Sequence, residues 1–192
     1  MSNNFFEEMQ RVENYNNQIY YMSPFANPLH SKVVANIHFA IRMFLKNSLC
    51  EVFGDSLDVY LDQDHKTYVI PDVSIICDRS NIKKDGYHGI PKFIVEVLSP
   101  STRERDMNEK KELYESYGIP EYWIVDPFIR AVDVYHLINK KYQRVRSYAE
   151  LSEKEIEQSL KHITLEEYKK PIILKEFPNI VIEVDEIFEG LW

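Results

Sequence analysis

Charged residues lie within two segments of the sequence that are otherwise apolar. Asp72 interrupts the apolar stretch over residues 69–76, and Glu96 lies inside the stretch over residues 93–98. Both stretches are short and rich in β-branched residues, a pattern typical of strands that are buried on both faces. A buried carboxylate is costly unless a cation or a hydrogen-bond donor meets it. A fold that buries these strands must therefore supply a partner for each carboxylate.

A lysine on the next predicted helix is a candidate partner. We expect a helix over about residues 104–117, and its 3.6-residue period places one set of residues toward the sheet: Asp106, Met107, Lys110, Leu113, Tyr114 and Tyr117. Lys110 lies near the middle of this face. It could form a structural ion pair, or its stem could cover the core while its ammonium reaches water. Two carboxylates held close together need a metal or a shared proton, so we favour a functional site.

The residues around both carboxylates also resemble a nuclease signature. Pro71-Asp72, followed by Glu96-Val97-Leu98, is similar to the Pro-Asp and Asp/Glu-x-Lys signature of the PD-(D/E)XK nuclease superfamily, except that Leu98 occupies the lysine position. Within that superfamily, residues 96–127 resemble the Uma family of restriction-endonuclease-like proteins. In that family the missing lysine is understood to lie on the following helix, and Lys110 matches it. The resemblance implies that Asp72, Glu96 and Lys110 are catalytic.

The order of predicted elements indicates an α/β fold. We expect a helix from His30 to about residue 48, strands near residues 51–61 and 68–77, the Glu96 strand and the Lys110 helix. Further strands are expected near residues 19–22, 122–126, 131–137, 142–147 and 180–183, and a short helix near residues 164–169. This order predicts a mixed central sheet with a helix on each side. The resemblance implies the restriction-endonuclease-like core.

We expect one domain over residues 1–192, with a core over about residues 13–150 and a C-terminal extension over about residues 151–192. Alternation along the Glu96 strand places Ile94, Glu96 and Leu98 on one face, so Leu98 should form a wall of the site.

The predicted function is metal-dependent hydrolysis of a DNA phosphodiester bond. Asp72 and Glu96, with the Val97 carbonyl oxygen, would hold Mg²⁺ or Mn²⁺, because hard cations prefer oxygen ligands. Lys110 would orient the attacking water or neutralise the developing negative charge. The alternative is a non-catalytic DNA-binding or scaffold protein on the same fold.

Two further residues are candidates for this site. His30 lies at about the same helical angle as the apolar residues of the first helix, and in the Uma family a histidine opens this helix. A catalytic His30 and a hydrogen-bonded core histidine both fit this pattern. Glu13 resembles an acidic N-terminal position of the family, and its role stays open.

The net charge of −8 argues against a protein that coats nucleic acid by bulk electrostatics. A local patch could still hold phosphates, and Lys140, Lys141, Arg144 and Arg146 form one candidate. The same residues could instead protect a solvated hairpin edge. Arg103 and Arg105 begin the Lys110 helix, where cations oppose the helix dipole, which hints at an anionic partner.

Cys50 and Cys77 are too few for a disulfide framework and match no zinc spacing. The sequence contains no secretory signal and no apolar run of membrane-spanning length, so we expect a cytoplasmic protein that does not enter a membrane.

A homodimer is expected because cutting both strands of a duplex requires two sites. Apolar residues after Glu150 have no predicted place in the core, and they could form the dimer contact or cover one edge of the sheet: Ile172, Ile173, Leu174, Phe177 and Phe188.

Overall fold

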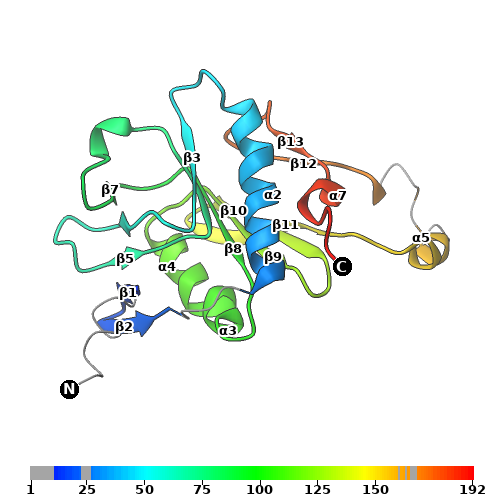
Figure 1. Cartoon of the computed structure of the whole chain (residues 1–192), viewed down its shortest axis with the longest axis horizontal. Coiled ribbons are helices and arrows are strands. Elements are labelled where there is room, and N and C mark those ends of the chain that lie inside the picture. The colour runs from blue at the N-terminus through cyan, green and yellow to red at the C-terminus, as the bar shows by residue number, and fades with distance from the viewer. Residues whose placement is uncertain (1–10, 23–26, 160, 163, 165–167) are drawn as a thin grey trace.

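A six-stranded mixed sheet forms the centre of the computed structural model (Figure 1), which describes residues 11–22, 27–159, 161–162, 164 and 168–192. The strand order is β11-β10-β9-β8-β6-β3. The strands are β3 (Glu51–Gly54), β6 (Val73–Ile76), β8 (Phe93–Val97), β9 (Glu121–Asp126), β10 (Ala131–Ile138) and β11 (Lys141–Ala149). Within this sheet β8 and β9 pair in parallel, and the other neighbours are antiparallel. The predicted α/β class with a mixed sheet is confirmed.

Helices cover both faces of this sheet, as predicted. The helix α2 (Pro28–Phe44) packs on one face, where Asn27 caps its first turn by accepting a hydrogen bond from the Leu29 amide at 2.9 Å. The other face is covered by a continuous helical segment made of α3 (Arg103–Arg105), the π-helix η2 (Asp106–Lys110) and α4 (Lys111–Ser116). Every residue of β8 is buried, because its alternate side chains enter the two separate cores.

A smaller five-stranded sheet lies beside the central sheet, with the order β2-β1-β5-β4-β7. Its strands are β1 (Val12–Tyr15), β2 (Gln18–Tyr21), β4 (Val59–Tyr60), β5 (Tyr68–Val69) and β7 (Tyr87–His88). The strand expected over residues 68–77 is therefore two strands, β5 and β6, which belong to different sheets. The break falls at residues 70–72, where Pro71 has no amide hydrogen for a sheet ladder. Asp72 consequently lies at a strand end rather than inside a strand.

The C-terminal residues pack into the core on the α2 side. Here β12 (Ile172–Ile173) pairs with β13 (Val181–Ile182), and α7 (Val184–Ile187) lies beside α2 in Figure 1. Ile172, Leu174 and Phe188 are buried in that core, and Phe177 packs against it, so assigning this group to a dimer contact is wrong. Ile173 alone among the five is mostly exposed, at 51%. These residues cover the sheet instead.

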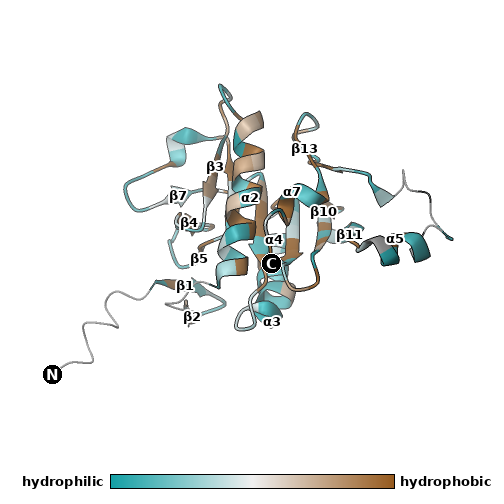
Figure 2. Ribbon diagram, turned by 45° about the vertical axis from the view of Figure 1, so that its right-hand side comes forward, coloured by the Kyte–Doolittle hydropathy of each residue, from teal (hydrophilic) through white to brown (hydrophobic). Residues whose placement is uncertain are grey.

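The helix α5 (Glu153–Ser159) was not predicted, and Figure 2 shows that it is largely hydrophilic. Half of the helix expected over residues 164–169, namely residues 165–167, lies outside the described residues. Across the described part of the chain, no helix combines the length and the apolar character needed to cross a membrane.

A disulfide bond joins Cys50 to Cys77, which the sequence analysis did not predict. The two cysteines flank β3 and β6, whose antiparallel register pairs Glu51 with Ile76. Extending this register by one residue places Cys50 opposite Cys77. The pairing signal was present in the strand pattern, but a count of cysteines alone could not find it.

Reduction of this disulfide should lower the free energy of unfolding by about 2–4 kcal/mol, because a cross-link restricts the unfolded chain. Urea denaturation with and without a thiol reductant measures the change. The Cys50→Ser/Cys77→Ser double variant is the control and should not respond to the reductant. Two titratable thiols in the untreated protein would contradict the assignment.

Candidate functional site

The two predicted carboxylates meet at one point of the central sheet. In the antiparallel register of β6 and β8, Val73 pairs with Val95. Continuing that register by one residue places Asp72 opposite Glu96. The backbone amide of Val97 donates a hydrogen bond to Asp72 Oδ2 at 2.7 Å, which ties Asp72 to the residue that follows Glu96. The structure therefore brings Asp72 and Glu96 together.

Lys110 lies inside this group, as predicted. Its Nζ is 2.8 Å from Glu96 Oε1, 2.8 Å from Glu13 Oε1 and 3.9 Å from Asp106 Oδ1. The hydroxyl of Tyr114 donates a second hydrogen bond to Glu96 Oε1, at 2.6 Å. Because the Lys110 side chain is only 3% exposed, its charge is neutralised by protein groups rather than by water.

A π-helix presents Lys110 and Asp106 to the site. The wider turn over Asp106–Lys110 places both residues inside, one at each end of the segment. Met107 is 37% exposed, so its predicted place on the inner face is wrong. The prediction used a regular 3.6-residue period, which a π-helical turn does not follow. Single π-helical turns are rare and frequently occur at functional sites.

His30 contacts the site from the first turn of α2. Its Nε2 lies 3.1 Å from Asp72 Oδ2. Burial alone would lower the pKa of His30, but the hydrogen bond and the charge of Asp72 outweigh it and raise that pKa. The His30 and Asp72 side chains are 17% and 10% exposed, compared with 3% for both Glu96 and Lys110. Solvent therefore reaches the site from the side of His30 and Asp72.

Glu13 belongs to the same cluster, although the sequence analysis left its role open. It is fully buried on β1 and accepts a hydrogen bond from the Ile70 amide at 2.8 Å, in addition to the contact with Lys110. Arg105 Nη2 lies 3.6 Å from Glu13 Oε2. Because β1 was not predicted as a strand, nothing in the sequence pattern indicated that Glu13 would be buried.

Neighbouring carboxylates hold both arginines at the start of the helical segment. Arg105 faces Glu13, and its guanidinium lies over the Tyr20 ring at 5.0 Å from the centroid. Arg103 forms an ion pair with Asp126. These internal partners explain cations at a helix N-terminus without an external anion.

Carboxylates outnumber cations in the buried cluster, in which Glu13, Asp72, Glu96 and Asp106 meet Lys110 and Arg105. Burial raises the pKa of Glu96, and the charges of Asp72 and Asp106 add to that effect against the opposing charge of Lys110. Burial likewise raises the pKa of Asp106 to about 6. Burial alone would lower the pKa of Lys110, but Glu13, Glu96 and Asp106 together raise it, so the lysine keeps its charge. Burial thus disfavours the charged form of these two carboxylates, and a bound cation or a shared proton would relieve this penalty.

The donor atoms of this cluster fit a hard divalent cation. Among the described residues, hydrogen bonds to Asp72 end at its Oδ2, and hydrogen bonds to Glu96 end at its Oε1. The other oxygen of each carboxylate, Asp72 Oδ1 and Glu96 Oε2, can therefore coordinate a metal. Asp106 Oδ1 is buried without a hydrogen-bond partner. Mg²⁺ is usually held by one or two carboxylates and keeps several waters. A pair of carboxylates with a backbone carbonyl oxygen, as predicted with Val97, meets that requirement.

The predicted basic patch lies on the hairpin of β10 and β11, and β11 is an edge strand. Lys141 pairs with Glu115 at 2.6 Å, Arg144 pairs with Asp133 at 3.2 Å, and Arg146 lies over the Tyr148 ring. These contacts favour the interpretation of a charged, protected sheet edge over that of a phosphate-binding patch.

Comparison with a solved structure defines the class of fold. The crystal structure of a "putative nuclease belonging to DUF820" from Anabaena variabilis ATCC 29413 matches 98% of this chain and 97% of that chain, with a TM-score of 0.70 and 16% sequence identity. The two proteins therefore share a fold, and in this chain that fold carries the carboxylate cluster.

Sequence comparison gives the family. Residues 3–167 match the model described as "Uma2: Putative restriction endonuclease", and the chain belongs to this family. A relative named "Uncharacterized protein slr1290" from Synechocystis sp. (strain ATCC 27184 / PCC 6803 / Kazusa) is 31% identical over 134 residues, which cover 68% of this chain and 70% of that protein. The family resemblance inferred from residues 96–127 is confirmed.

Replacing Lys110 with Ala should destabilise the fold by about 3–5 kcal/mol, because it leaves Glu13 and Glu96 as buried charges without their main partner. Lys111→Ala is the matched control. The Lys111 ammonium lies over the Tyr135 ring at 4.9 Å, and its loss should cost less than about 1 kcal/mol. Urea denaturation of both variants measures the difference. Equal stability of the two variants would contradict a central role for Lys110.

Proposed function

We propose that this protein is a metal-dependent endonuclease that hydrolyses DNA phosphodiester bonds. The observation that carries the proposal is the meeting of Asp72 and Glu96 at adjacent strands, with a buried lysine in contact with Glu96. Membership of the family described as "Putative restriction endonuclease" supports the same activity. The metal we propose is Mg²⁺, with Mn²⁺ as its substitute, held by Asp72, Glu96 and the Val97 carbonyl oxygen.

A bound Mg²⁺ would supply Lewis acidity and lower the pKa of a bound water. Side chains of the protein would stabilise charge and hold the metal-binding carboxylates in position. Lys110 would donate a hydrogen bond to the attacking water or to a phosphate oxygen, which favours the charge that develops in the transition state. Tyr114 would hold Glu96 in place by its 2.6 Å hydrogen bond to Oε1. His30, at the more exposed side, would orient Asp72 through its 3.1 Å contact with Oδ2.

The second candidate function is a non-catalytic DNA-binding or scaffold protein. The burial of the cluster favours it, because the Glu96 and Lys110 side chains are each 3% exposed and already form an ion pair with each other. In that case the cluster would be a structural ion network that links β1, β8 and η2. Metal binding and cleavage separate the two candidates.

We further propose that the enzyme acts as a homodimer in the cytoplasm, where DNA is its partner. Apolar side chains exposed on α2 and the loop after it support a contact between copies: Phe39 at 66%, Met43 at 59% and Leu49 at 79%. Cleavage of both strands of a duplex would use two sites related by a two-fold axis.

Calorimetric titration with Mn²⁺ tests the cofactor. We expect binding by the wild-type protein and loss of binding in Asp72→Asn and Glu96→Gln, which keep a hydrogen-bond acceptor for the neighbouring donors. Glu121→Gln is the matched control, because Glu121 is also a buried carboxylate on the same sheet but bonds Trp123 and Lys175 instead. Equal affinity in the wild type and both site variants would exclude this metal site.

Cleavage assays on supercoiled, linear duplex and single-stranded DNA with Mg²⁺ test the activity itself. We expect Glu96→Gln to abolish cleavage. Lys110→Ala, assayed at a temperature where it remains folded, should lose roughly 10²–10³ in turnover, as when one donor to a developing charge is removed. Metal binding with no cleavage of any of these forms by the wild type would favour the scaffold function.

Light scattering at micromolar concentration tests the assembly. A homodimer predicts twice the 22.9 kDa mass of one chain. Phe39→Glu should shift the protein toward the monomer, because it places charge in the proposed contact. A wild-type protein that remains at the mass of one chain would contradict the dimer.

A further inference from the structure

A second group of metal-ligating side chains lies on the five-stranded sheet, and it shares no residue with the carboxylate cluster. It consists of His65, Asp85 and His88, whose ligand atoms all lie within 4.8 Å of one another. Among the described residues no other group of three or more histidines, cysteines or carboxylates is this compact. We propose that these three residues bind one divalent transition-metal cation of the zinc type.

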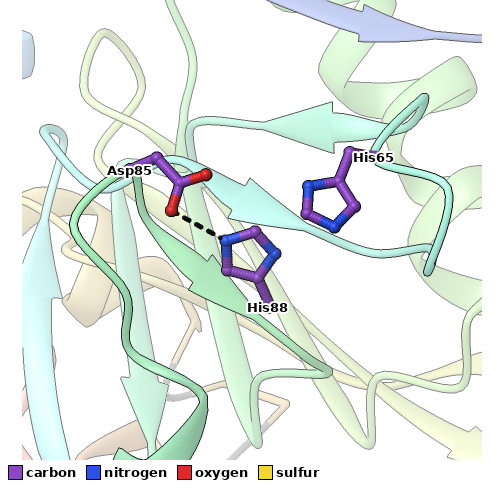
Figure 3. Close-up of side chains that lie close together, drawn as sticks. All are labelled: His65, Asp85 and His88. Carbon is purple, nitrogen blue, oxygen red and sulfur yellow. Dashed lines mark hydrogen bonds and ion pairs between the residues drawn. The ribbon is translucent and has the colours of Figure 1, made fainter.

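The three residues come from different segments that the sheet brings together. His65 lies in the turn between β4 and β5, with a positive φ of 57°, and His88 lies on β7. The strands β4 and β7 pair in parallel, which sets Tyr60 beside His88. Figure 3 shows the His65 ring facing the pair formed by His88 and Asp85.

Packing holds both imidazoles in place. The Tyr60 ring stacks on His88 with centroids 4.5 Å apart, and it contacts His65 at 5.3 Å. The two histidine rings themselves are 4.5 Å apart. Because each ring is already oriented, a metal would not have to order these side chains on binding.

The loop that carries Asp85 is also fixed by its backbone. The Lys83 amide donates to the Gly86 carbonyl at 2.7 Å, which closes a turn around Asp85. Gly86 has a φ of 149°, and a Cβ there would lie 2.4 Å from the Asp58 carbonyl oxygen. Only glycine permits this close approach. Asp85 Oδ1 lies 3.0 Å from His88 Nε2.

The ligand set selects the class of metal. Two imidazoles and one carboxylate suit Zn²⁺, Ni²⁺ or Cu²⁺, whereas Mg²⁺ prefers oxygen ligands alone. The His65 and Asp85 side chains are exposed, so an ion can reach them from solvent. Three protein ligands leave the fourth position of a tetrahedral zinc site to water or to an incoming anion. This site and the carboxylate cluster should therefore bind different metals.

Equilibrium dialysis of the full chain against Zn²⁺ in excess Mg²⁺ tests the proposal, with zinc counted per chain and thermal unfolding followed in parallel. We expect one zinc per chain and a zinc-dependent rise in the unfolding temperature. His65→Ala and His88→Gln should each weaken zinc binding more than about tenfold, because removing even an outer partner of a ligand costs 10–100-fold. His38→Gln, a histidine on α2, is the control and should bind zinc as the wild type does.

Glu96→Gln separates this inference from the proposed nuclease, since it should lose Mn²⁺ binding and cleavage but keep zinc. A wild-type chain that binds no zinc, or His65→Ala and His88→Gln variants with unchanged zinc affinity, would overturn the proposal. Loss of zinc binding in Glu96→Gln alone would assign the zinc to the carboxylate cluster and overturn it equally.

Discussion

The burial of Lys110 between Glu96 and Glu13 is the interaction on which the rest of the structure depends. One ammonium group, 2.8 Å from a carboxylate on β8 and 2.8 Å from another on β1, connects the central sheet to the smaller sheet. Such a network is expensive to desolvate, and it holds only if each member keeps its partners. The π-helical turn, the place of β1 and the broken strand at Pro71 all serve to bring those partners together.

This network also accounts for the electrostatics of the site. Burial is the largest cause of the raised pKa values of Glu96 and Asp106, and repulsion from neighbouring carboxylates adds to it against the charge of Lys110. A divalent cation would supply the missing positive charge, and a lysine fixed nearby would act on the same reaction centre. The burial of these carboxylates thus links the stability of the fold to the proposed chemistry.

The sequence predicted the parts of the fold that follow from periodic apolar patterns. The strand of Glu96 and the helix of Lys110 are strongly patterned, so their existence and their contact could be inferred. Glu13 could not be assigned, because the four-residue strand β1 has little pattern of its own and Glu13 is buried by residues far away in the sequence, including Ile70 and Lys110. Met107 was misplaced because a π-helix changes the helical period, and the Cys50–Cys77 bond depends on a strand register that composition does not reveal.

The central claim is that Asp72 and Glu96 together hold a divalent cation beside Lys110. Anomalous diffraction from crystals grown with Mn²⁺ tests it most directly, because the anomalous signal locates the metal itself. The account predicts a peak within coordination distance of Asp72, Glu96 and the Val97 carbonyl oxygen. Crystals in which Mn²⁺ binds only at other positions, with no peak near Asp72 and Glu96, would contradict it.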